Sequence, residues 1–313
     1  MLKWFESKFP DFKCEIAKIV NAGGASRIID YNCDEVPILG TAGRYRTPYI
    51  TEDGKICIHE TFLSYVWALS YSIMVIFDEE FHGPRTGQQP GHGKEIGEFL
   101  QFGYDVLEYG LYLRRSYKRW PNSLPNPDPN WYRGDDTYYP QRANGIYVAA
   151  VDFILCHELG HAACGHLKKD AEARSKGKFI PSYEIKEGEI EADAWALERV
   201  IRGVKHSPEN KETVGFGAIA GLACLLFLRK DLTSRTHPDT DSRIRAVLER
   251  LGEEKIKNLW GIAATYYVAW SHASSAGLDF GVEFDTYGDF VDHIERQLSE
   301  IKFCEEKRRF TFD

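Results

Sequence analysis

The sequence lacks the cysteine pairs and the long apolar runs that are typical of secreted or membrane-spanning proteins. Its seven cysteines are widely spaced, and no C-x-x-C occurs. This argues against a disulfide framework or a cysteine zinc site and favours a reducing, cytoplasmic compartment. The apolar stretches 62–77 and 215–228 fall short of the roughly 20 residues of a spanning helix. We therefore expect buried core helices, no secretory signal and no integral membrane segment.

Clustered basic charge is also missing. Asp and Glu number 47 against 39 Lys and Arg, which gives a formal net charge of -8. Binding to a phosphate backbone requires grouped cations, so no nucleic-acid partner is expected. The length of 313 residues and the hydrophobic content of 43% are enough for one large domain with its own core.

The hydrophobic pattern predicts a mainly α (α+β) fold. Residues 26–30 and 49–58 have β-type composition, with a hairpin turn at 52–55. The later helical periodicity predicts helices over 60–80, 94–118, 146–168, 184–203, 212–229, 240–251, 253–272 and 285–303. We expect an N-terminal mixed α/β segment over residues 1–58 and a helical domain over 59–313, forming one compact unit.

Two loops are expected between these helices. Residues 83–93 are rich in Gly, Pro and Gln, and residues 120–140 are dense in proline. Proline removes an amide donor and favours extended structure, so both segments are predicted to be non-helical. A loop as long as 120–140 either shapes a cleft or is a surface excursion, and the sequence leaves both interpretations open.

The strongest functional signal is the motif His157-Glu158-Leu159-Gly160-His161. Histidines at i and i+4 emerge on one face of a helix, so both imidazoles can bind one Zn²⁺. Glu158 lies about 100° round the helix and can take a proton from a zinc-activated water. The flanking residues are apolar nearly all round, which indicates a buried helix where unpartnered imidazoles would be costly. The alternative is a pair of hydrogen-bonded core histidines.

A catalytic zinc needs a third protein ligand, and a downstream acidic helix offers candidates. The helical pattern there predicts a core stripe of four residues, Ile190, Ala194, Leu197 and Ile201. Glu189 flanks that stripe among small residues and is the expected buried ligand, whereas Glu191 lies where a charge is easily solvated. Asp193 is expected to orient His157 or His161. The alternative is a surface acidic helix.

Two more histidines follow the motif. His166 is five residues after His161, about 140° away on a continuing helix, so it is not expected to be a ligand. His237 stands in the segment Thr236-His237-Pro238, and a histidine donor near a developing oxyanion is chemically sensible. A His-Pro turn before a helix is the alternative interpretation for His237.

The combined pattern resembles known peptidase families. H-E-x-x-H followed by E-x-x-x-D is similar to the gluzincin pattern of the Ste24/HtpX-type peptidases, and residues 236–243 are similar to their T-H-P-x-x-x-x-R segment. That resemblance implies that Glu189 is the third zinc ligand. It also implies that His237 binds the substrate carbonyl or the oxyanion, and that Arg243 holds the acidic residues around the site.

In length and motif position the chain is more similar to the phage-exclusion (Lit-type, U49) peptidases, whose N-terminal core helix resembles residues 59–67. This resemblance implies an intracellular protease that cleaves a host protein, such as a translation factor, during phage infection. An ungated protease would harm the cell, so an activating protein or peptide is a further expected partner.

We predict a zincin-like, zinc-dependent endopeptidase domain over residues 59–313. It is expected to bind an extended protein substrate along an edge strand near the helix that carries the His157–His161 motif. One alternative is a housekeeping quality-control peptidase of the Ste24/HtpX type. The other is a non-catalytic, zinc-stabilised binding module, against which Glu158 argues because a structural site needs no base.

Overall fold

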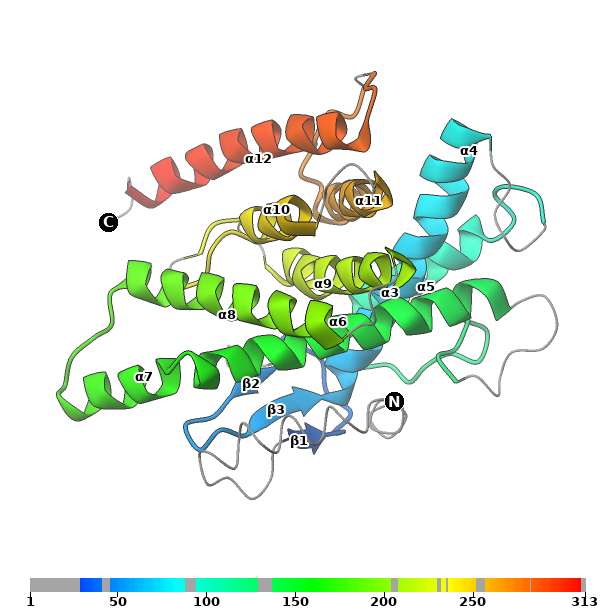
Figure 1. The fold of residues 1–313 in the computed structure, drawn as a ribbon. Helices are drawn as coiled ribbons and strands as arrows, with labels where there is room; N and C mark the ends of the chain where they lie inside the picture. Colours follow the sequence, from blue (N-terminus) through cyan, green and yellow to red (C-terminus); the bar gives the residue numbers. More distant parts are fainter. Residues whose placement is uncertain are drawn as a thin grey trace.

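The structure is a computed structural model. It describes residues 29–40, 46–87, 94–128, 137–203, 208–229, 232–234, 236–251, 257–281 and 283–310. These segments form a mainly helical fold with one small sheet, which confirms the fold class predicted from the sequence. Figure 1 shows the sheet at one end of the helical body and the C-terminal helix at the opposite end.

The sheet has three strands in the order β1-β3-β2. Strand β1 (Ile29–Asn32) runs parallel to β3 (Ile56–His59), and β2 (Tyr49–Ile50) pairs antiparallel with the other side of β3. The expected turn lies between β2 and β3, where Gly54 adopts a positive φ of 77°. Strand β2 is therefore an edge strand of this sheet. Residues 26–28 of the expected first strand lie outside the described residues.

The first long helix is buried almost all round. Helix α3 (Glu60–Ile76) is capped by His59, whose ring accepts a hydrogen bond from Thr61 N at 3.1 Å. It continues through a π-helical turn, η1 (Phe77–His82), into α4 (Gly83–Thr86). The expectation that 83–93 is all loop is wrong for its first four residues, because the proline in α4 lies in the first turn, where its missing N–H costs nothing.

Helix α6 (Tyr138–Ala163) carries the histidine motif and differs from the prediction at both ends. It begins eight residues before the expected 146, and Pro140 is tolerated because it lies in the first turn. It ends at Ala163 rather than at 168, since Gly165 adopts a positive φ of 81°. A separate helix, α7 (His166–Ser175), follows. Within the expected loop 120–140, residues 129–136 lie outside the described residues.

Two helices pack closely on α6, namely α8 (Ser182–Gly203) and α9 (Pro208–Leu228). Gly217 and Gly221 lie four residues apart on α9 and face α6. A Cβ at Gly217 would lie 2.4 Å from Ala149 Cβ, and one at Gly221 would lie 3.2 Å from Phe153 Cδ1. The absence of side chains at these two positions is what lets α9 lie against the helix that carries the motif.

Gly217→Ala is expected to destabilise the protein by roughly 1–3 kcal/mol, because the added methyl overlaps the backbone of α6. Chemical denaturation of both proteins measures the difference in free energy of unfolding. Gly145→Ala is the matched control on α6, since its Cβ would meet only Thr213 Cγ2, at 3.9 Å. Equal stability of Gly217→Ala and Gly145→Ala would contradict the packing described here.

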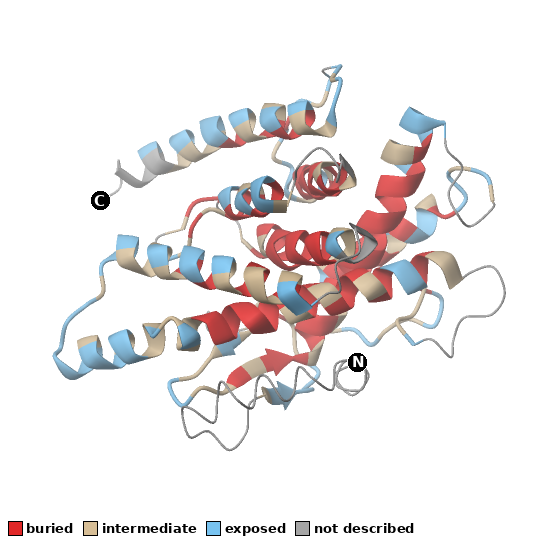
Figure 2. Cartoon of the chain, viewed as in Figure 1, coloured by how far each residue is buried: buried red, intermediate tan, exposed pale blue. Residues whose placement is uncertain are grey.

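The remaining helices complete the core. Helix α5 (Leu100–Leu113) packs on α3 and is shorter than the expected 94–118. Helices α10 (Thr240–Leu251) and α11 (Lys257–Ser274) cover α9, and α12 (Tyr287–Phe310) packs on α11. Figure 2 shows that the buried residues concentrate in α3, α6, α9 and α11. The histidine motif therefore lies on a helix at the centre of the fold.

Three of the described helical segments are long and apolar enough to cross a membrane: Glu60–Thr86, Tyr138–Ala163 and Lys211–Leu228. The expectation that the apolar stretches are too short is therefore wrong, because α3 extends through η1 and α4. Within the most apolar window of each segment, 89%, 67% and 78% of the residues are buried inside the protein. Most of this apolar surface contacts other helices of the chain, as expected for core helices.

Candidate metal centre and active site

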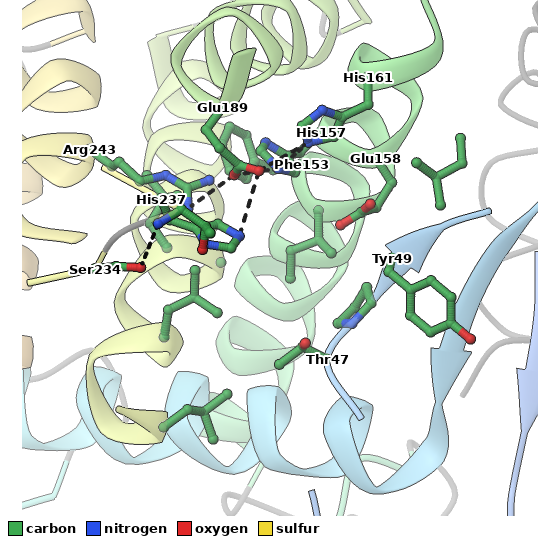
Figure 3. A pocket seen from close by; sticks show the side chains of 18 of the residues that line it. Thr47, Tyr49, Phe153, His157, Glu158, His161, Glu189, Ser234, His237 and Arg243 are labelled. Atoms are coloured by element: carbon green, nitrogen blue, oxygen red, sulfur yellow. Dashed lines mark hydrogen bonds and ion pairs between the residues drawn. The ribbon is translucent and has the colours of Figure 1, made fainter. Parts of the chain in front are cut away.

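Helices α6 and α8 are in close contact at Gly160, the fourth residue of the histidine motif. A Cβ at this position would lie 3.1 Å from both Cα and the carbonyl oxygen of Ala192 on α8. This close approach places Glu189, one turn before Ala192, opposite His157 and His161. Figure 3 shows these side chains pointing toward one another from the two helices.

The three side chains form a compact group of ligand atoms. His157 Nε2 lies 3.5 Å from Glu189 Oε2, and His161 Nε2 lies 3.5 Å from Glu189 Oε1. The two Nε2 atoms are 3.3 Å apart. Bonds of about 2.0–2.1 Å to a tetrahedral zinc would separate its ligand atoms by about 3.3–3.4 Å. The spacing observed here therefore suits one ion of that size, and the group is one that could hold a metal.

The reasoning that led to Glu189 contains an error. The expected core stripe included Ile190 and Ala194, but Ile190 is 55% exposed and Ala194 is exposed as well. The buried residues of α8 are Glu189, Ala192, Ala196, Leu197 and Val200. Two of these residues, Ala192 and Ala196, are small, and the close contact between Ala192 and Gly160 of α6 leaves no room for a larger side chain at position 192. Glu189 thus lies on the buried stripe itself and not beside it.

Asp193 and Arg243 support the group from behind. Asp193 Oδ1 lies 2.7 Å from His157 Nδ1, the ring nitrogen that faces away from Glu189. Arg243 of α10 donates to both oxygens of Asp193, from Nε at 2.6 Å and from Nη2 at 2.7 Å. The arginine is buried, and its charge lowers the pKa of the Asp193 carboxyl despite the opposing effect of burial. A carboxylate held in this way fixes the ring orientation of His157.

The charges of the metal-free group are unevenly distributed. Burial lowers the pKa of His157, but Asp193 and Glu189 outweigh it and raise the value to about 10. Burial and the charge of His157 lower the pKa of His161 to about 4. Burial opposes ionisation of Glu189, yet its contacts with His157 lower its pKa to about 2. At neutral pH His157 is therefore a protonated imidazolium when no cation is bound. A metal ion would have to displace the proton on its Nε2.

Glu158 is buried but lies outside this group of three. Burial and the nearby Glu189 raise its pKa to about 7, while the charge of His157 and the neighbouring backbone of Ile50 favour the carboxylate form. Ile50 belongs to the edge strand β2, so that strand lies directly beside the motif, as expected from the sequence. A carboxyl group with this pKa can accept and release a proton near neutral pH.

These residues line a cleft of about 760 Å³. Its walls come from α6, α8 and α9, from the edge strand with Thr47 and Pro48, and from the segment before α10. His237 belongs to that last segment, with Nε2 at 3.6 Å from Glu189 Oε1 and Nδ1 at 2.8 Å from Thr236 Oγ1. The side chain of His237 is 37% exposed and faces the cleft (Figure 3). Of the seven site residues expected from the sequence, six line this cleft, and Asp193 lies behind them against His157 and Arg243.

One neighbour of the group was not anticipated. His166 Nδ1 lies 3.0 Å from His161 Nδ1, and His166 Nε2 lies 3.0 Å from Glu191 Oε2. The sequence analysis placed His166 on a far face because it assumed a helix that continues to residue 168. Gly165 ends that helix and turns His166 back toward His161. A glycine directly after a helical pattern is the signal that could have revealed this turn.

The donor set fits a divalent metal ion. Glu189 Oε2 is buried and has only distant partners among the described residues, with His157 Nε2 at 3.5 Å and Arg243 Nη1 at 3.8 Å. Leaving a charged oxygen in that position is costly unless another partner binds it. Two imidazoles and a carboxylate, with a fourth position left open, are the ligands of catalytic zinc in several hydrolases. His157, His161 and Glu189 would be the ligands in this chain.

Gly160→Val is expected to lower the affinity for the metal at least about tenfold, because the side chain must force Ala192, and with it Glu189, away from the histidines. Competition with a chromophoric zinc chelator measures the affinity. The control is Gly203→Ala on α8, whose added Cβ meets nothing within 4 Å. Unchanged metal affinity in Gly160→Val would show that the approach of α8 to α6 does not set the ligand spacing.

Comparisons of the sequence with known proteins point to a peptidase family. The sequence model of the family described as Peptidase U49 matches residues 56–263, which is more than half of the chain. The protein named "Cell death peptidase" of Escherichia coli (strain K12) is 22% identical over 252 residues, which cover 76% of this chain and 77% of that protein. No solved structure matches. The matched region contains the motif on α6 and the carboxylates of α8, and the chain therefore belongs to the Peptidase U49 family.

Proposed function

We propose that this chain is a zinc-dependent endopeptidase, with His157, His161 and Glu189 as zinc ligands. The observation that carries the proposal is the separation of their ligand atoms by 3.3–3.5 Å inside a buried cleft. The family supplies the class of reaction, and this donor set supports a metal-dependent form of it. The open cleft beside the ligands argues for catalysis, because a purely structural zinc site closes its fourth position.

The residues around the ligands have distinct roles in this proposal. When bound, zinc acidifies the attacking water and polarises the substrate carbonyl. Glu158 takes the proton from that water and returns it to the leaving amine, a role that suits a pKa of about 7. His237 donates a hydrogen bond to the carbonyl oxygen as negative charge develops on it. Asp193 and Arg243 hold His157 in position.

The edge strand β2 is the proposed docking site for an extended substrate. It pairs with β3 on one side, and its other side lines the cleft beside Glu158. A peptide that adds to this edge by main-chain hydrogen bonds would pass directly over the ligand group. Because backbone atoms make these contacts, the strand would recognise an extended conformation, and the side chains lining the cleft would select the sequence.

The biological role that we propose is a cell-death response in the cytoplasm. The support is the name of the Escherichia coli relative and the family to which the chain belongs. The protease would cleave a host protein, such as a translation factor, and an activating protein or peptide would restrict this cleavage to phage infection. Expression of the chain alone tests this restriction, since strong toxicity without a trigger would contradict gating.

Mapping of new protein N-termini tests the proposed activity. The purified full chain is stripped of metal, reloaded with one equivalent of zinc, and incubated with lysates of infected and uninfected bacteria. New N-termini are expected with the zinc-loaded protein and not with the stripped protein. If neither form cleaves any protein in either lysate, the peptidase proposal fails and a zinc-stabilised binding module becomes the better interpretation.

A further inference from the structure

A second group of potential metal ligands lies on the outer side of the first. Cys164 after the end of α6, His166 at the start of α7 and Glu191 on α8 each offer one ligand atom, and these three atoms lie within 4.8 Å of one another. His166 is positioned by close packing, because a Cβ at Gly188 would lie 3.4 Å from its ring. Glu191 is mostly exposed, so this group is open to ions from solvent.

The ring of His166 connects the two groups. His161 turns Nε2 toward His157 and Glu189, so in the metal-bound form its Nδ1 must carry the hydrogen. That hydrogen needs an acceptor, and His166 Nδ1 is 3.0 Å away. Neutral His166 then carries its own hydrogen on Nε2, which points at Glu191 Oε2, also 3.0 Å away. This arrangement orients His161 in the same way that Asp193 orients His157.

We propose that Cys164, His166 and Glu191 form a second, inhibitory site for a thiophilic divalent cation such as Zn²⁺. A thiolate, an imidazole and a carboxylate are all zinc ligands, and solvent can supply a fourth. A cation on His166 Nε2 leaves the hydrogen of the neutral ring on Nδ1. Two N–H groups, those of His161 and His166, then face each other at hydrogen-bond distance, and neither has an acceptor.

The two sites are therefore antagonistic. Occupation of the second site removes the acceptor that stabilises the metal-binding tautomer of His161. Loss of such a partner lowers metal affinity by roughly 10–100-fold. The coupling is reciprocal, so the first ion weakens binding of the second by the same factor. The second site consequently fills only at raised metal concentration, and filling it weakens binding of the catalytic ion by that factor. This antagonism rests on the proposed function of the first group.

Cobalt tests the second site directly. The full chain carrying one equivalent of zinc is titrated with Co²⁺, and the thiolate-to-cobalt charge-transfer band is recorded in the near ultraviolet. The band is expected in the wild type and in the control Cys304→Ser, whose cysteine is exposed on α12. It is expected to be absent from Cys164→Ser. A band that persists in Cys164→Ser, or no band in the wild type at large excess of Co²⁺, overturns the second site.

Retention of isotope-labelled zinc tests the antagonism. The first site is loaded with the label, Co²⁺ is added, and the bound label is measured after gel filtration. Affinity for the label is expected to fall roughly 10–100-fold in the wild type and to stay constant in Cys164→Ser. Equal loss from both proteins overturns the coupling. If the chain binds no labelled zinc but still shows the cobalt band, the proposed function fails while the second site stands.

Discussion

Glu158→Gln is expected to lower peptide-bond cleavage by about 10²–10⁴-fold, because the amide cannot take a proton from the attacking water. The substitution keeps the size of the side chain, and Glu158 is not among the three residues whose ligand atoms fit a metal. Metal content should therefore stay at one equivalent. The measurement combines quantified new N-termini in a lysate with elemental analysis of the same purified sample.

The substitution removes the charge of a buried side chain and keeps its shape, which makes the test specific for proton transfer. A change in folding is therefore not expected, and the thermal unfolding of both proteins checks this. Glu172→Gln, on the exposed surface of α7, is the control for loss of a carboxylate. Cleavage that survives in Glu158→Gln at the wild-type rate would remove Glu158 from the mechanism.

Glu189→Gln is expected to lower zinc affinity more than about 100-fold, beyond the effect of losing an outer partner of a ligand. Both oxygens of Glu189 face the histidines, each at 3.5 Å from one ring nitrogen, so the amide replaces a charged donor with a weaker neutral one. Competition with a chelator of known affinity measures the change. Cleavage should be lost in parallel with bound zinc at limiting zinc.

Two further variants on α8 serve as comparisons for the zinc affinity of Glu189→Gln. Glu187→Gln removes an exposed carboxylate two residues away and should leave zinc affinity unchanged. Asp193→Asn acts on His157 rather than on the ion, so its affinity loss should lie in between, at roughly 10–100-fold. The order Glu187→Gln, Asp193→Asn, Glu189→Gln is the expected ranking. Unchanged zinc affinity in Glu189→Gln would show that Glu189 is not a ligand.

Local periodicity was a good guide wherever one helix carried the information. The i, i+4 spacing of His157 and His161 predicts a shared face, and the structure places their Nε2 atoms 3.3 Å apart. The helices 240–251 and 184–203 were also predicted to within two residues, because their polar and apolar residues alternate with a clear helical period. Predictions were less accurate at helix ends, where Pro140 and Gly165 decide the outcome through their position in a turn.

The sequence predicted less well which side of one helix packs against another. Helical spacing predicts that Ile190 lies on the core stripe of α8, yet that residue is 55% exposed. The position of Ile190 depends on which side of α8 faces α6, and that side is set by the contact between Gly160 and Ala192. A single helix pattern contains no record of its partner, so a stripe of small residues is easily passed over.

The sequence by itself determined the helical class, the paired histidines with the glutamate between them, and the resemblance to a peptidase family that the comparisons then confirmed. These features depend on residue type and spacing along one segment. Only the tertiary structure decided that Glu189 faces both histidines, that Arg243 pairs with Asp193 across two helices, and that His166 turns back onto His161. Those contacts join residues that lie 5 to 50 positions apart in the sequence. Tertiary packing, such as the contact of Gly160 with Ala192, brings them within hydrogen-bond distance, and spacing along the chain does not.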